Sequence, residues 1–464
     1  MNHIGWLASI IALTAQANCC AAEASHHDTD AAAFTSSVDS VAREWLASTG
    51  APSASIAIVR HGQLVYAQAY GSARLDPPTA AAPESRYSID SLTKEFTAAG
   101  ILMLVERGRL ELDDPISRWF PTLGAASATT VRELLTHTSG IRDYWPQDFV
   151  TPEMKIATTP DAVIQEWAKR PLDFVPGSEW QYSNTGYVLA AKVLERASGE
   201  GFLPFLEQNI FLPLKMAHVL DVTMPPAPAD AVGYTRFGLG PVHAAAKEAP
   251  GWLFGAANLI MQPSDMARWD VSLMDRSLLH AQSYASEFAP VVLKNRTVAP
   301  YALGLDVERS EGRLRIGHSG GGSGFLADNR LWPEERAAIV VFTNNDWASP
   351  SELSSRIAFL LLTPSPPEAR VRAVFSALQK GSLDRREFTA VGNSYFTNDV
   401  LADLRATLGP LGPMRELVLE AESKRGGMIT RHWKILCRDM RLAATERGYA
   451  NGQLEEFMVT ARQD

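Results

Sequence analysis

Residues 37–363 have strand patterns near both ends. Between these, residues 114–300 have mostly helical patterns that Pro and Gly interrupt. Near the start, a helical pattern over residues 37–46 precedes two strand patterns that meet at His61-Gly62, which predicts a hairpin. The strand patterns cover residues 53–59, 63–70, 301–307, 314–318, 324–332 and 337–343, and a helix over residues 350–362 follows them. We therefore expect an α/β (α+β) domain, in which an antiparallel sheet built from both ends is flanked by helices and carries an inserted helical subdomain.

A short run with three prolines, at residues 364–367, follows this domain and is typical of a linker. Beyond it, residues 368–464 predict a separate small α+β domain, whose role the sequence does not indicate. Its helices are expected at residues 368–380 and 398–408, and its strands at residues 416–421, 428–438, 440–444 and 453–460.

The first residues have the pattern of a secretory signal peptide. The apolar run at residues 4–15 is too short to cross a bilayer, and small residues at 15–17 and 20–22 offer cleavage sites. We expect a signal peptide at residues 1–22, a disordered linker at residues 23–36, and a periplasmic or secreted protein. A buried N-terminal helix is the alternative, and no other segment has the pattern of a transmembrane span once the signal is removed.

Composition and charge exclude some functions. The net charge of −9 argues against a partner nucleic acid. The three cysteines imply no disulfide framework, although Cys19 and Cys20 raise the alternative of a lipoprotein anchor. No residue pattern indicates a metal or an organic cofactor.

The first chemical pattern is Ser91-Leu-Thr-Lys94 at the start of an apolar helix. Ser88 or Asp90 is expected to cap this helix, which continues to about residue 105. Residues three apart share one face of a helix, so Lys94 lies beside Ser91. A serine hydroxyl needs a base to take its proton, and a lysine serves when burial lowers its pKa. An exposed lysine at a helix start is the plainer interpretation of the motif alone.

The second pattern, Tyr182-Ser183-Asn184, lies on a loop before a helix expected near residue 185. A tyrosine near a lysine can move a proton between the serine and a leaving group, and an asparagine amide can hold the polar backbone of an acyl donor. By itself the pattern also fits an ordinary polar turn.

The third pattern, His318-Ser319-Gly320-Gly321, follows an apolar strand. Glycines there allow a substrate to approach the strand edge closely. A free backbone N–H at this place, together with that of Ser91, would form an oxyanion hole. A glycine-rich hairpin with an incidental histidine and serine is the alternative.

Taken together in this order, the three motifs resemble those of the penicillin-recognising serine hydrolases, which include DD-peptidases, class C β-lactamases, related esterases and D-aminopeptidases. The resemblance covers about residues 37–363 and includes Leu134-Leu-Thr-His-Thr-Ser-Gly-Ile141 and Asp265-Met-Ala-Arg-Trp269. It implies a serine hydrolase that forms an acyl-enzyme on an amide or ester bond of a small-molecule or peptide substrate, including cell-wall peptides ending in D-alanine.

The resemblance also implies roles for single residues. Ser91 would be the acylated nucleophile, and Lys94 and Tyr182 would share the work of general base and general acid. Asn184 would orient the substrate amide.

On the strand, His318, Ser319 and Gly320 would contact the substrate, while the backbone N–H groups of Ser91 and Gly321 would hold the oxyanion. His318 stands where many members have lysine, a permanent cation. This departure favours a peptidase, amidase or esterase over an efficient β-lactamase, and it leads to the hypothesis that the charge state of His318 controls activity.

Two other functions compete with this interpretation. Gly317-His-Ser-Gly-Gly321 fits the nucleophile elbow of α/β-hydrolases, with Ser319 as nucleophile and His432 as base. That elbow requires a helix after the turn, whereas the pattern here continues into a strand. A cell-wall sensor that binds penicillin without turnover is the second alternative. Such a protein would often lack a catalytic side chain, whereas this sequence has all four of Ser91, Lys94, Tyr182 and Asn184.

Overall fold

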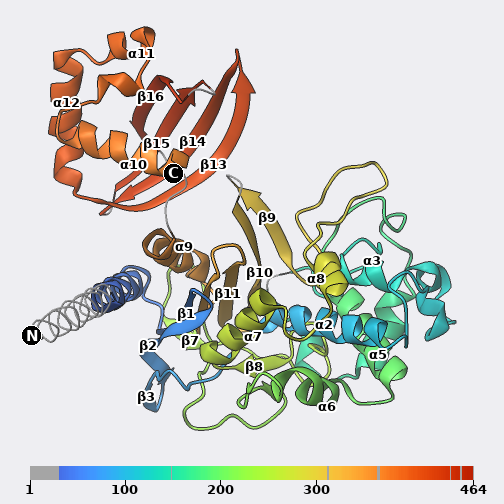
Figure 1. Cartoon of the computed structure of the whole chain (residues 1–464). Helices are drawn as coiled ribbons and strands as arrows, with labels where there is room; N and C mark the ends of the chain where they lie inside the picture. Colours follow the sequence, from blue (N-terminus) through green and yellow to red (C-terminus); the bar gives the residue numbers. More distant parts are fainter. Residues whose placement is uncertain are drawn as a thin grey trace, which may run out of the picture.

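A computed structural model describes residues 31–147, 149–310, 313–362, 366–438, 440–449 and 452–462 (Figure 1). The expected signal peptide, residues 1–22, lies outside the described residues. The chain forms a large sheet with an inserted helical region, followed by a small C-terminal part with its own sheet and helices. This confirms the expected fold class.

The large sheet has seven strands in the order β3-β2-β1-β12-β11-β10-β9, and its neighbours pair antiparallel. The strands are β1 (Ser53–Arg60), β2 (Gln63–Leu75), β3 (Pro78–Ala80), β9 (Asp306–Ser310), β10 (Arg313–Gly322), β11 (Phe325–Trp332) and β12 (Ala337–Thr343). The first and last of the predicted strand groups therefore meet at the β1–β12 pair, where Ile56 lies opposite Val341. The strand expected at residues 301–307 begins instead at residue 306, because residues 302–305 form a turn that Tyr301 and Asp306 close.

Helices cover both faces of this sheet. Alternate residues of β1 pack into different cores: Ala54, Ile56 and Ile58 face one, whereas Ala57 and Val59 face the other. A helix over residues 31–49 and α9 (Pro350–Leu361) cover the first face. Burial of each large apolar side chain contributes roughly 1.5–3 kcal/mol, so this two-sided burial holds the layers together.

The helix at residues 31–49 begins earlier than expected, so the prediction of a disordered linker is wrong for residues 31–36. The three alanines at 31–33 favour helix. Phe34 packs against the core on the first face of the sheet, and its ring lies beside the Arg60 guanidinium.

The second face carries the inserted helical region and the remaining short elements. Its helices and turns are η1 (Asp90–Leu92), α2 (Thr93–Glu106), η2 (Ile116–Arg118), η3 (Gly124–Ala128), α3 (Val131–Leu135), η4 (Glu153–Lys155), α4 (Pro160–Val163), η5 (Ile164–Ala168), α5 (Asn184–Ser198), α6 (Phe202–Leu206), η6 (Glu207–Phe211), α7 (Pro263–Asp275) and α8 (Ala281–Glu287). The short strands are β4 (Tyr87–Ser88), β5 (Leu220–Asp221) and β8 (Leu259–Met261), which form one small sheet, and β6 (Tyr234–Arg236) and β7 (Val242–Ala244), which form another.

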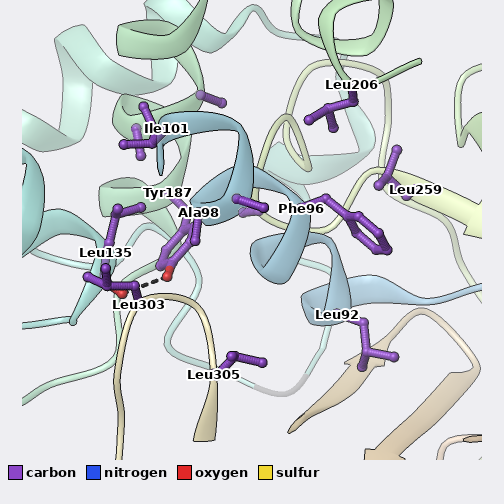
Figure 2. Packing of buried hydrophobic residues seen from close by; sticks show 14 of the residues in the cluster. Leu92, Phe96, Ala98, Ile101, Leu135, Tyr187, Leu206, Leu259, Leu303 and Leu305 are labelled. Atoms are coloured by element: carbon purple, nitrogen blue, oxygen red, sulfur yellow. Dashed lines mark hydrogen bonds between the residues drawn. The ribbon is translucent and has the colours of Figure 1, made fainter. Parts of the chain in front are cut away.

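Helix α2 lies at the centre of this face and is buried nearly all round, as expected for a helix with apolar residues on every side. Phe96 and Ile101 project from α2 into the core that also holds Leu206 of α6 and Leu303 (Figure 2). The expected side-chain cap is absent: neither Ser88 nor Asp90 caps the helix, because Ser88 donates to the Asp90 carboxylate and Asp90 begins the turn η1.

The C-terminal part packs three helices on one face of a four-stranded sheet (Figure 1). Its elements are α10 (Pro366–Gln379), η7 (Arg385–Glu387), α11 (Ala390–Tyr395), α12 (Asn398–Leu408), η8 (Gly409–Leu411), β13 (Met414–Arg425), β14 (Met428–Cys437), β15 (Met440–Gly448) and β16 (Leu454–Ala461). The linker prediction is wrong at Pro366 and Pro367, which form the first turn of α10, where proline costs no hydrogen bond. Within the described ranges, no helix is long and apolar enough to cross a bilayer.

Candidate active site

Ser91 and Lys94 meet where the turn η1 passes into α2. The Lys94 Nζ lies 3.0 Å from the Ser91 Oγ. Two more acceptors hold the ammonium nitrogen: the Asn184 Oδ1 at 2.9 Å and the backbone carbonyl of Ala256 at 2.9 Å. The Lys94 side chain is fully buried, whereas Ser91 is partly exposed and lines a cavity. A buried base therefore touches an accessible hydroxyl.

The pKa of Lys94 is lowered to about 7, mainly because burial penalises the charged ammonium. The nearby carboxylates of Asp143 and Asp90 oppose this effect and raise the pKa of Lys94. Near neutral pH a large fraction of Lys94 is then uncharged and can take a proton from Ser91.

Asp143 is a site residue that the sequence motifs did not reveal. It is buried, and its two carboxylate oxygens accept hydrogen bonds from the backbone N–H (3.0 Å) and the side-chain Nδ2 (3.2 Å) of Asn184. The Asn184 Oδ1 is thereby turned toward Lys94. The prediction that Asn184 orients a substrate amide stays a prediction, and its observed contacts hold Lys94.

Tyr182 lies over the same pair. The Lys94 Nζ is 4.8 Å from the centre of the Tyr182 ring, and the Tyr182 hydroxyl hydrogen-bonds to Ser91. Burial raises the pKa of Tyr182 well above its ordinary value, although the hydrogen bond to Ser91 opposes this effect. Tyr182 therefore keeps its proton near pH 7 and is available as a donor.

The strand β10 brings glycines against the nucleophile turn. A methyl group on Gly320 would lie 2.2 Å from the backbone carbonyl of Ile89, so only glycine allows this approach. Gly321 then lines the same cavity as Ser91, Tyr182 and Asn184, which has a volume of about 990 Å³. Ser91 and Gly321, whose backbone N–H groups are expected to hold the oxyanion, therefore line one shared cavity.

His318 has a different place from the one its position in the motif suggests. Its Nδ1 donates to the carbonyl of Ser319 (2.5 Å), which leaves Nε2 to accept from the hydroxyl of Tyr301 (2.8 Å). Both ring nitrogens are thus used within the protein, and His318 and Ser319 line a neighbouring smaller cavity.

Burial, together with the nearby charge of Lys94, lowers the pKa of His318 to about 3. The imidazole is therefore neutral near pH 7. This lowered pKa argues against the hypothesis that the charge state of His318 controls activity, which stays a prediction, and the group with a pKa near neutrality beside Ser91 is Lys94.

The nucleophile-elbow alternative also fails. Ser319 lies inside the strand β10, and the chain passes through Gly322 into strand β11 rather than into a helix. His432 lies on β14 of the C-terminal sheet, exposed beside Thr445.

Solved structures share the fold of this chain. An octameric penicillin-binding protein homologue from Pyrococcus abyssi shares the fold at 22% identity with a TM-score of 0.63, over 92% of this chain and 96% of its own. A D-stereospecific amidohydrolase from Streptomyces sp. matches at 26% identity and a TM-score of 0.59, over 69% of this chain and 96% of its own. The fold is that of penicillin-binding proteins and related amidohydrolases.

The beta-lactamase family profile matches residues 38–359, and the chain belongs to this family. Penicillin-binding protein 4* of Bacillus subtilis (strain 168) is similar at 31% identity over 305 residues, which are 61% of this chain. This chain spans 66% of the length of that relative.

Proposed function

We propose that this protein is a serine hydrolase that cleaves amide or ester bonds through an acyl-enzyme. One observation carries the proposal: a fully buried Lys94 with a lowered pKa contacts the hydroxyl of the accessible Ser91. A lysine that served only to cover the surface would keep its charge in water.

In the proposed reaction, neutral Lys94 takes the proton of Ser91 as the Ser91 Oγ attacks the substrate carbonyl carbon. The backbone N–H groups of Ser91 and Gly321 hold the negative oxygen that develops. The carbon–nitrogen or carbon–oxygen bond then breaks, and Tyr182 gives a proton to the leaving group while it regains one from Lys94. Water, activated by the same pair, hydrolyses the acyl-enzyme. Asn184 and Asp143 keep Lys94 in place throughout.

We infer that the substrate is a D-alanyl peptide, a D-amino-acid amide or an ester rather than a β-lactam that is turned over quickly. Two observations support this choice. The relatives include a penicillin-binding protein and a D-stereospecific amidohydrolase, named as such. His318 is neutral and bonded to Tyr301, so it offers a β-lactam carboxylate no fixed positive charge. The expected periplasmic or secreted location would give the protein access to cell-wall peptides.

Intact-protein mass spectrometry with benzylpenicillin tests the proposal. The protein is expected to gain one penicilloyl adduct, Ser91→Ala none, and Ser319→Ala the same adduct as wild type. Consumption of the drug is followed in the same samples, because fast turnover leaves little adduct. If the site is too narrow to admit penicillin, hydrolysis of a p-nitrophenyl ester by the same variants tests the role of Ser91.

Loss of both reactions in Ser319→Ala but not in Ser91→Ala would overturn the proposal. A stable adduct with no hydrolysis of ester, D-alanyl peptide or D-amino-acid amide would identify the non-catalytic penicillin-binding sensor instead.

A further inference from the structure

A second cavity of about 460 Å³ lies next to the active-site cavity, and Ser323 lines both. Ser91 lines the first, whereas Asp90, the residue just before it, lines the second. Most of the second cavity's wall is apolar and comes from Met224, Leu253, Phe254, Ile260 and Phe325. Its volume is that of a site for a small organic molecule.

The Asp90 carboxylate is the unusual feature of this cavity. Asp90 is 3% exposed, and its Oδ1 accepts from the Ser88 hydroxyl at 2.8 Å. Its Oδ2 is buried without a hydrogen-bond partner among the described residues. A methyl group on Gly322 would lie 2.6 Å from the Asp90 Oδ1, so this glycine leaves room for the carboxylate. Buried carboxylate oxygens without partners are rare, because each loses its contacts with water.

A second acid adds to the negative charge. Glu248 lines the same cavity, and its Oε1 accepts from the Ser323 hydroxyl at 2.5 Å. Burial and, as a smaller cause, the proximity of Glu248 raise the pKa of Asp90 to about 7. The pKa of Glu248 is raised by burial as well.

Arg86 and Lys247 line the cavity, and the charge of Lys94 reaches Asp90 from the active site. Arg86 makes a two-pronged ion pair with Asp230, with both contacts at 2.8 Å. Lys94 is held by its three acceptors in the active site, and its charge lowers the pKa of Asp90. Lys247 is exposed, and its charge lowers the pKa of Glu248. A third lining acid, Asp221, already accepts from Thr223 and Asn258. Arg86 is paired with Asp230, and no described cation is within ion-pair distance of Asp90 or Glu248.

We propose that this cavity binds a primary ammonium group carried on a small apolar body, with the ammonium between Asp90 and Glu248 and the body against the apolar wall. An ammonium has three N–H donors, and it can donate to the unpartnered carboxylate oxygen of Asp90 and to the carboxylate of Glu248. A metal ion fits less well, because no group of three His, Cys, Asp or Glu side chains in the described ranges is placed to hold one. The site goes beyond the proposed hydrolysis and does not depend on it.

Isothermal titration calorimetry of the full chain with 2-phenylethylamine and with its neutral counterpart 2-phenylethanol tests the proposal. At pH 8 the amine is expected to bind at least tenfold more tightly than the alcohol. Asp90→Asn is expected to weaken amine binding at least tenfold and to leave alcohol binding unchanged, and asparagine tolerates the positive φ of 47° at this position. Glu248→Gln, on a partly exposed loop, is expected to weaken it to a smaller extent.

Asp403→Asn, at an exposed position of α12, is the charge-matched control and is expected to change nothing. Lowering the pH from 8 to 6 should weaken amine binding about tenfold, because only about a tenth of Asp90 is ionised one unit below its pKa. The groups that face Asp90 and titrate or carry charge are Ser91's base Lys94 and the acid Glu248. A crystal structure of the complex should show the ammonium between the two acids.

Three results would overturn the proposal. These are equal binding of amine and alcohol, amine binding that neither Asp90→Asn nor Glu248→Gln weakens, and a complex in which the ammonium lies in the active-site cavity. Ser91→Ala should bind the amine as tightly as wild type does. Amine binding can therefore be tested even if the protein proves to have no hydrolase activity.

Discussion

The Nδ1 of His137 accepts a hydrogen bond at 3.1 Å from the backbone N–H of Ser183, the residue directly after Tyr182. The carbonyl of His137 accepts from the N–H of Gln181, the residue directly before it, at 3.0 Å. The centres of the His137 and Tyr182 rings are 4.2 Å apart. His137 thus holds the backbone on both sides of Tyr182, as expected of a structural histidine.

His137 is therefore predicted to position Tyr182 rather than to carry a proton. His137→Leu removes the acceptor for Ser183 and should lower kcat at least tenfold with little change in KM. It should also cost about 1–3 kcal/mol of stability, because a buried N–H is left unpaired. His137→Asn keeps an oxygen near the Nδ1 position and tolerates the positive φ of 58°, so it should restore part of kcat. Steady-state ester hydrolysis and urea unfolding measure both effects, and equal kcat values in the two variants would contradict this role.

The rate of acylation should rise with pH through a limb near 7, because neutral Lys94 is the base and its pKa is about 7. Asp90→Asn should move the limb to lower pH, since the Asp90 carboxylate raises the pKa of Lys94. Stopped-flow measurement of kcat/KM between about pH 5 and pH 9 gives the pH at the midpoint of this limb. His318→Asn should leave the position of the limb unchanged, and a shift there would return His318 to consideration as the titrating group.

Stability should fall as the pH rises toward 8, because Glu287 is buried with both carboxylate oxygens unpaired among the described residues. Burial, with a smaller effect of Glu106, raises the pKa of Glu287 to about 8. Its protonated form stabilises the fold fully below the ordinary pKa of a glutamate, and this contribution is lost as the pH rises to about 8, by roughly 1.4 kcal/mol per pH unit at most.

Glu287→Gln cannot ionise, so its unfolding free energy should depend less on pH between 5 and 8, about the range that separates the two pKa values. Urea unfolding at several pH values measures the slope, and Glu200→Gln, at an exposed position, is the control. Parallel pH profiles for wild type and Glu287→Gln would contradict the prediction.

Gly320→Ala should abolish activity or folding, because its methyl group would lie 2.2 Å from the carbonyl of Ile89 and push β10 away from the nucleophile turn. Overpacking of this kind costs about 1–3 kcal/mol or more. Gly201→Ala is the matched control, because its methyl group would meet Pro204 at an ordinary 3.5 Å. Thermal unfolding and ester hydrolysis of both variants test the prediction, and an active, stable Gly320→Ala would refute the close contact.

The sequence by itself determined those features that depend on neighbours in the chain. The hairpin at His61-Gly62 and the helix at residues 398–408 follow from local patterns, and both are present in the structure. The three-residue spacing of Ser91 and Lys94 brings their side chains together on one turn, whatever the rest of the chain does. The motifs were therefore enough to predict the fold class and the family.

Only the tertiary structure decided the chemistry of these groups, because a pKa depends on burial and on partners from distant segments. Lys94 owes its environment to Asn184 and Ala256, which lie 90 and 162 residues further along the chain. His318 was expected to face the substrate, but Tyr301 and the carbonyl of Ser319 hold it neutral inside the protein. No spacing in the sequence indicates that Asp90 would be buried with an unpaired oxygen, since the cavity around it is built from five separate parts of the chain: residues 86–90, Pro160, and residues 221–231, 247–260 and 323–325.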